Sequence, residues 1–66
     1  MEDLFYTLKA LGLAVDFMED AVMCRKGALV TQAQDTGWTL MLEYPRLSFH
    51  AQDTDDLIRL LRRYTR

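Results

Sequence analysis

The chain has 66 residues, a formal net charge of −2 and a single cysteine, and half of its residues are apolar. A chain of this length is expected to form one small domain, residues 1–66, and one cysteine excludes an internal disulfide. One histidine and one cysteine cannot form a structural zinc site, so we expect no metal and no cofactor. Because so small a domain buries only about 60% of its unfolded surface, self-association is the remaining means of stabilisation, and we expect a homodimer.

The start of the chain indicates a cytoplasmic protein. Glu2 and Asp3 stand where a secretory signal would carry positive charge. Polar residues interrupt every apolar run before it reaches the roughly 20 residues of a membrane span. The single thiol suits a reducing compartment.

Residues 2–26 allow two interpretations. Apolar residues recur at spacings of three and four, which predicts a helix through residue 26, straight or broken at Gly12: Leu4, Leu8, Leu11, Val15, Met18 and Val22. If it is broken, Leu11-Gly12-Leu13 resembles a Schellman ending, and Asp16 with Glu19 would cap a second helix. The alternative is a strand at 13–18 and a hairpin through Glu19-Asp20. We favour the helix because Glu-Asp is a poor pair for a tight turn.

The middle of the chain predicts three strands. Ala28 to Gln34 is the first, and Asp35-Thr36-Gly37 is a turn. Trp38 to Tyr44 alternates apolar and polar residues, Pro45-Arg46 interrupts it, and 47–52 alternates again. The strands are expected to form an antiparallel meander.

The final segment, 54–66, predicts a helix capped by Asp53 or Thr54. Its apolar residues occupy one side, and its cations form a stripe on the other: Arg59, Arg62, Arg63 and Arg66. The expected fold is therefore α+β with two layers, an N-terminal helix, a three-stranded antiparallel meander and a C-terminal helix.

No group of residues predicts catalysis. Asp35-Thr36-Gly37 resembles the tripeptide of aspartic proteases, but the chain is too short for their barrel, and a hairpin turn explains the residues. His50 has no partner at a catalytic spacing and is expected to face solvent or an interface. Cys24 is expected to be a small apolar residue near an element's end. We therefore predict that the protein is not an enzyme.

The charges are divided along the chain. Residues 1–56 hold all ten acids and four bases, giving −6, whereas residues 57–66 hold four arginines and no acid, giving +4. We predict an acidic partner-binding surface formed by Asp16, Glu19, Asp20, Asp53, Asp55 and Asp56. The arginine stripe is the candidate basic surface, for nucleic acid or an acidic partner.

The predicted element order also resembles that of double-stranded RNA-binding domains. Those domains clamp phosphates with lysines at the start of the last helix. This chain has Asp53, Asp55 and Asp56 at that position, and their charge would repel phosphates. Nucleic acid is therefore the second choice of partner.

Apolar side chains on the long helix would exceed what the predicted sheet can cover, which indicates a dimer interface at Phe5, Phe17, Met18 and Met23. We therefore predict a non-enzymatic protein-binding module. By its size and charge it suits a small inhibitor or regulator of the kind that phages use against host or defence proteins, or a dimeric adaptor.

Overall fold

The computed structural model describes all residues from Met1 to Arg66 and has an α+β fold. A five-stranded antiparallel sheet has strand order β1-β2-β3-β4-β5, so every strand lies beside its neighbours in the chain. The elements are α1 (Glu2–Ala10), β1 (Ala14–Met18), β2 (Ala21–Cys24), a 3₁₀ turn (Arg25–Gly27), β3 (Leu29–Gln32), β4 (Trp38–Met41), β5 (Ser48–Ala51) and α2 (Thr54–Tyr64).

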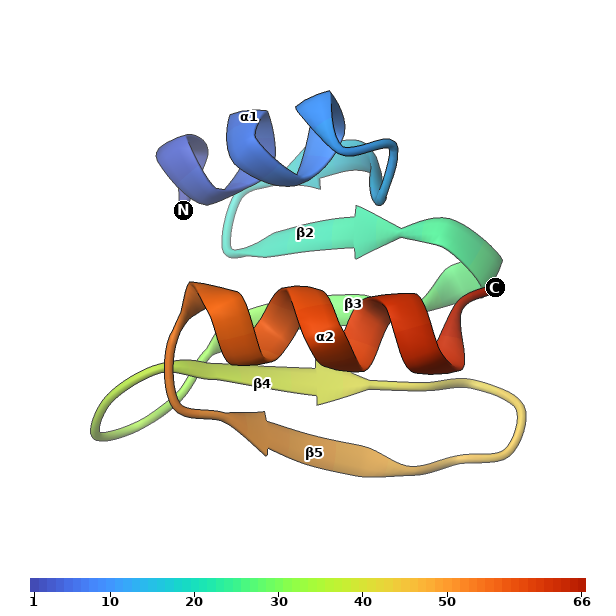
Figure 1. Cartoon of the computed structure of the whole chain (residues 1–66). Helices are drawn as coiled ribbons and strands as arrows, with labels where there is room; N and C mark the ends of the chain where they lie inside the picture. The colour runs from blue at the N-terminus through green and yellow to red at the C-terminus, as the bar shows by residue number, and fades with distance from the viewer.

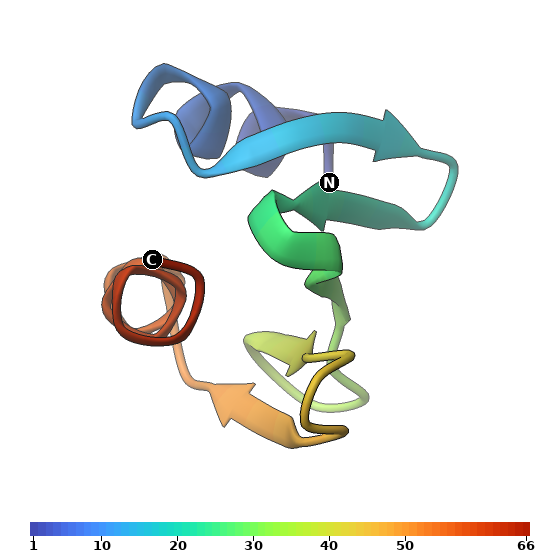
Figure 2. The ribbon, with the colours of Figure 1, turned by 90° about the vertical axis from the view of Figure 1, so that its right-hand side faces the viewer.

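Both helices cover the same face of the sheet, α1 beside β1 and α2 in front of β3 and β4 (Figures 1 and 2). The side chains that face the helices come from directly paired residues, since Phe17 pairs with Val22, Val22 with Val30 and Val30 with Leu40. One core therefore joins both helices to the sheet, formed by Leu4, Phe5, Leu8, Leu13, Val22, Cys24, Ala28, Val30, Leu40, Ala51, Leu57 and Leu61.

The predicted helix through residue 26 is wrong, because α1 ends at Ala10. Gly12 adopts φ +74°, and two hydrogen bonds close the helix: Gly12 N donates to Lys9 O at 3.0 Å, and Leu13 N donates to Leu8 O at 2.9 Å. This pair of bonds is the Schellman arrangement, which satisfies the last carbonyls of the helix and turns the chain away.

Residues 13–26 form the β1–β2 hairpin with its turn at Glu19-Asp20, as the alternative interpretation predicts. A continuous helix of 25 residues would be about 37 Å long, longer than the 27 Å of the whole molecule. As strands, the same apolar residues reach partners on β3 and α1. The predicted three-stranded sheet is therefore too small by two strands.

The later elements agree with their predictions to within a few residues. The predicted strands 28–34, 38–44 and 47–52 correspond to the shorter β3, β4 and β5. The 42–47 loop follows β4 and contains a cis Tyr44–Pro45 peptide bond. Asp53 caps α2 by accepting a hydrogen bond from Asp56 N at 2.8 Å.

The predicted apolar side of α2 is also correct. Leu57 and Leu61 are fully buried against the sheet, and the Tyr64 ring stacks on Phe49 of β5 with ring centroids 4.7 Å apart.

Candidate functional site

The face of the sheet opposite the helices is not covered by any other part of the chain (Figure 2). Residues that pair directly across antiparallel strands point to the same face. Met23 pairs with Leu29, and Leu29 pairs with Met41, so these three side chains form an apolar row across β2, β3 and β4. By the same pairing the row ends at Asp16 of β1 and Ser48 of β5, and the neighbouring row consists of Met18, Ala21, Thr31, Thr39 and His50.

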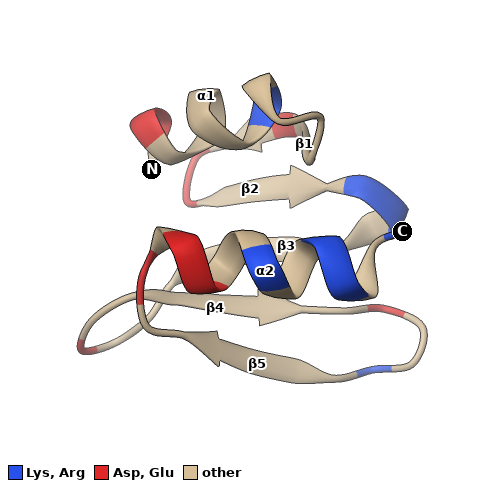
Figure 3. Cartoon of the chain, viewed as in Figure 1, with Lys and Arg blue, Asp and Glu red and all other residues tan.

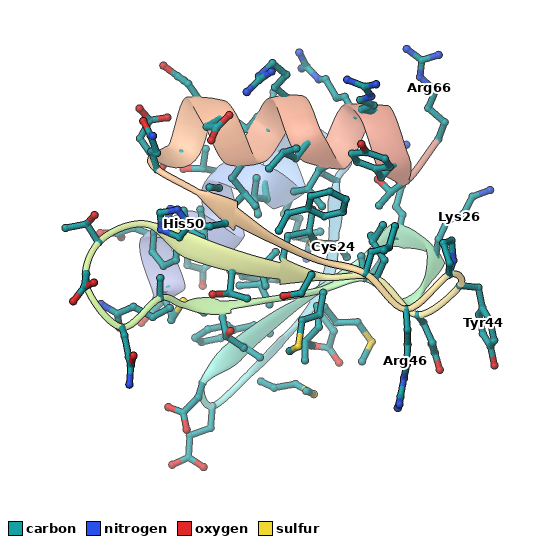
Figure 4. The ribbon with its side chains drawn as sticks, turned by 90° about the horizontal axis from the view of Figure 1, so that it is seen from below. Cys24, Lys26, Tyr44, Arg46, His50 and Arg66 are labelled. Carbon is teal, nitrogen blue, oxygen red and sulfur yellow. The ribbon has the colours of Figure 1, made fainter.

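Two methionine side chains of this surface are exposed, and Met23 is half-buried. Met41 retains 39% and Met18, at the end of β1, 41% of its surface. In Figure 4 most of the sulfur atoms lie on the side of the sheet away from α2, whereas Cys24 is labelled among the core side chains. Flexible methionines suit a surface that adapts to a protein partner.

A shallow hollow of about 400 Å³ continues the apolar row at one end of the open face. Leu29 and Met41 line it together with residues of the 42–47 loop. Its full lining is Gly27, Leu29, Met41, Leu42, Glu43, Arg46, Leu47 and Ser48. The hollow has room for apolar side chains of another molecule, with the charged Glu43 and Arg46 at its rim.

Charges are sorted between the two ends of the molecule (Figure 3). The antiparallel topology places the 19–20 turn, the 33–37 loop and the starts of both helices at one end. This acidic end holds eight of the ten acids: Glu2, Asp3, Glu19, Asp20, Asp35, Asp53, Asp55 and Asp56. The opposite, basic end holds seven of the eight bases, together with Glu43: Lys9, Arg25, Lys26, Arg46, Arg62, Arg63 and Arg66.

The two helices account for part of this sorting. α1 and α2 both start at the acidic end and finish at the basic end (Figure 1). Acids in the first turn and cations in the last turn each stabilise a helix by about 0.3–1 kcal/mol through its dipole. The charges in the loops of the sheet have no such reason to be sorted: Glu19, Asp20 and Asp35 at one end and Arg25, Lys26 and Arg46 at the other.

Five of the six predicted acidic residues lie at the acidic end, but on two separate segments, the β1–β2 turn and the start of α2. Asp53 caps α2, and Asp56 forms a salt bridge with Arg59. The hydrogen bond from Arg59, and then the one from Gln52 N, lower the pKa of Asp56 from its usual 3.8. Asp55 lies in the first turn of α2, whereas Glu19 and Asp20 form the β1–β2 turn and Asp16 lies within β1. The last three are on the other half of the sheet from α2.

The predicted arginine stripe lies along α2. Arg59 is occupied by Asp56, and Arg66 Nε donates to the carbonyl of Arg62 at 3.2 Å. The guanidinium of Arg63 lies 5.5 Å from the centre of the Tyr64 ring. These contacts agree with a role of the arginines in ending the helix.

The four predicted interface residues are separated in the same way. Phe5 is buried, and its ring stacks on Phe17 with centroids 5.4 Å apart, between α1 and the sheet. Met18 and Met23 lie on the open face. The surplus apolar surface therefore belongs to the sheet rather than to a long helix.

Cys24, His50 and Asp35, the residues considered for catalysis, each lie in a position that the fold itself explains. Cys24 is 1% exposed, and burial raises its thiol pKa to about 11. His50 Nε2 lies 2.8 Å from the carbonyl oxygen of Thr36, so the imidazole bridges β5 and the 33–37 loop. Asp35 is in that loop and exposed. No three His, Cys, Asp or Glu side chains are grouped closely enough to hold a metal ion.

Sequence reasoning missed Leu29, Met41, Leu47, Lys26 and Arg46 as parts of the surface. The available signal was the alternation of Trp38, Leu40 and Leu42 with Thr39 and Met41, which places Met41 on the face opposite the core. The apolar row becomes visible only when the register of β2, β3 and β4 is known.

No family model matches the chain, and neither the curated proteins nor the solved structures include one that is detectably similar. Neither helix has the length and apolar character needed to cross a membrane.

Proposed function

We propose that this chain is a non-enzymatic protein-binding module whose docking surface is the open face of the sheet. The observation that carries the proposal is the apolar row of Met23, Leu29 and Met41, which continues into the hollow beside Leu47. Such a row, rimmed by threonines and charged loops, has the arrangement of a protein interface, an apolar centre with a polar rim.

Within this proposal the chain acts in the cytoplasm as a small inhibitor or regulator of a larger protein, of the kind that phages encode, or as a homodimeric adaptor. Its small size and the acidic end support an inhibitor, because an acidic surface matches basic patches of nucleic-acid enzymes. Met18 and Met41, each about 40% exposed, support a binding surface that adapts to its partner.

The proposal is tested by placing a charge on the open face. Met41→Arg and Met18→Arg each put a cation at a side chain that a partner would bury, whereas Tyr6→Arg changes a 60% exposed aromatic residue on α1. Tagged wild type and variants are exposed to a lysate of the encoding cell, and captured proteins are quantified by mass spectrometry.

We expect a protein that wild type and Tyr6→Arg capture equally and that Met41→Arg loses, with a decrease of at least about tenfold, because a desolvated unpaired charge costs several kcal/mol. Circular dichroism must show the same folded spectrum for all variants. Capture that is insensitive to both methionine substitutions would remove the open face from the proposal.

Nucleic-acid binding at the basic end is the second candidate. Cations from the 3₁₀ turn, the 42–47 loop and α2 gather there, and Tyr44 is 89% exposed in the same region, where it could stack on a base (Figure 4). With Arg59 held by Asp56, three stripe arginines remain, and if these three alone neutralise phosphates of a duplex, the plot of log affinity against log salt has a slope of about −2.7. A duplex and a single strand of labelled RNA and DNA that show no binding at 50 mM salt, a low salt concentration, would exclude this candidate.

A further inference from the structure

We infer that the open face binds a second copy of this chain in an antiparallel face-to-face dimer, with the two-fold axis lying in the face and running across the strands. This inference rests on the proposed docking surface and names its partner. The observation that selects a second copy is that one molecule carries both members of a complementary pair, an acidic end and a basic end.

Rotation about such an axis exchanges the two ends of the molecule. The apolar row of one copy then lies over the apolar row of the other, because the row runs along the axis. The acidic end of each copy meets the basic end of its partner, so the charge contact forms twice. An axis along the strands would instead bring like ends together.

Because the axis runs across the strands, each strand lies over its own counterpart, so the β1–β2 turn faces the region of the partner's 25–27 turn and the 42–47 loop faces the region of the partner's 33–37 loop. The β1–β2 turn with Glu19 and Asp20 lies on the far side of the sheet from α2 (Figure 2). At the other end, Arg46 extends from the 42–47 loop to the side of the sheet away from α2, whereas Lys26 extends outward from the 25–27 turn (Figure 4). Asp16 pairs with Met23 and therefore lies at the β1 end of the row. Packed sheets cross at about −30°, and this angle separates Asp16 of one copy from Asp16 of the other.

Sorting of the loop charges also has an energetic consequence within one molecule. Like charges gathered at an end repel one another, and the helix dipoles do not offset this for residues in the sheet loops. Glu19, Asp20, Lys26 and Arg46 are exposed, and none of them forms a salt bridge within the chain. A second copy supplies the opposite charges that these residues lack.

The area that a dimer would bury is a modest share of the surface of this chain. A standard interface buries about 800 Å² per partner, about a sixth of the 4620 Å² of accessible surface of this chain. The open face, the hollow and the loops at its two ends belong to a molecule of 27 × 26 × 21 Å.

Charge reversal in the loops tests the orientation. The first variant carries Lys26→Glu and Arg46→Glu, so both of its loop ends are acidic. The second carries Glu19→Lys and Asp20→Lys, so both ends are basic. The control carries Arg62→Glu and Arg63→Glu, which changes the net charge as much as the first variant does, at the same end of the molecule but on α2. Leu29→Arg tests the apolar row.

Sedimentation equilibrium at low ionic strength measures the mass of each protein. We expect wild type and the α2 control to have twice the 7.7 kDa chain mass. Each loop variant alone should dissociate at least about tenfold more readily, because like charges meet at both contacts. An equimolar mixture of the two loop variants should return to a dimer that contains one copy of each, and Leu29→Arg should be monomeric.

Three results would overturn the inference: a monomeric wild type at high micromolar concentration, equal weakening by the loop and α2 variants, or a mixture of loop variants that stays monomeric. Growth of wild type beyond a dimer would also overturn it, because a head-to-tail contact does not close. If wild type is monomeric while Met41→Arg still loses a captured protein, the inference fails and the proposed docking surface stands. If Met41→Arg has no effect on capture or on mass, both fail.

Discussion

Replacement of Gly37 by alanine tests how closely the 33–37 loop packs against the end of β5. Gly37 has φ +82°, and a Cβ atom at this position would lie 2.0 Å from the carbonyl oxygen of Ala51 and 2.9 Å from that of Gln52. Both obstacles are backbone atoms at the edge of the sheet, which cannot rotate away as a side chain would. Gly12 is the matched control, because it has φ +74° but no atom within 4 Å of the corresponding Cβ.

Gly37→Ala and Gly12→Ala share the cost of a positive φ angle, but only Gly37→Ala has the additional cost of a steric clash. An L-residue with positive φ costs about 1–2 kcal/mol, which applies to both glycines. The close approach at Gly37 adds about 1–3 kcal/mol for displacing β5, by analogy with overpacking. Gly37→Ala should therefore lower the free energy of unfolding by about 2–5 kcal/mol, a large part of the roughly 3–10 kcal/mol available to a domain of this length.

Urea denaturation followed by Trp38 fluorescence measures both changes, and thermal melts provide a second measure, with about 4–8 °C expected for each kcal/mol. Asparagine separates the two causes, because it tolerates positive φ better than alanine. Gly12→Asn should recover most of the loss, whereas Gly37→Asn should not. Equal losses for the two alanine variants, or full recovery in Gly37→Asn, would refute the close approach of Gly37 to Ala51.

Three further predictions concern single side chains. Asp53→Ala removes the cap of α2 and should lower the free energy of unfolding by about 1 kcal/mol in urea denaturation, whereas Asp55→Ala, which leaves the cap in place, should cost less. Cys24 is 1% exposed, and burial raises its thiol pKa to about 11, so a thiol reagent at pH 8 should label it only at the rate at which the fold opens; prompt stoichiometric labelling of the native protein would contradict this. The pKa of Asp56 is lowered by the hydrogen bond from Arg59, so its carboxylate stabilises the fold above pH 3.8 and this contribution is lost as the pH falls through the folded-state pKa. The difference in urea stability between wild type and Asp56→Asn should accordingly be present at pH 7 and shrink below pH 3.8; a difference that persists in acid would show that the ion pair is not its source.

The elements that the sequence predicts correctly are those with local signals. Alternation defines β4, and the Asp53 cap with the arginines of the last turn defines α2. At 13–26 the spacing of apolar residues fits a helix and two short strands equally well, and long-range pairing of Val22 with Val30 decides between them. The deciding local signal was Gly12, whose Schellman bonds end α1.

The candidate surface was harder to predict than the fold, for a related reason. Met23, Leu29 and Met41 are far apart in the chain, and each looks like an ordinary strand residue by itself. Only the register of three strands brings them into one row. Likewise, the acidic and basic halves of the sequence do not predict that Arg25, Lys26 and Arg46 join the basic end, because their position depends on which strand ends lie side by side.

The sorted charges of this molecule therefore have two separable origins. Glu2, Asp3, Lys9 and the charged ends of α2 lie where helix dipoles favour them, so their removal should change the stability of the monomer. The loop charges lie outside any helix, and single exposed charges contribute little to folding. These loop charges form no salt bridge within the chain, and a bound molecule of opposite charge would supply the partners that they lack. The fold thus makes the loop charges of the sheet, rather than the arginine stripe of α2, the informative test of what this chain binds.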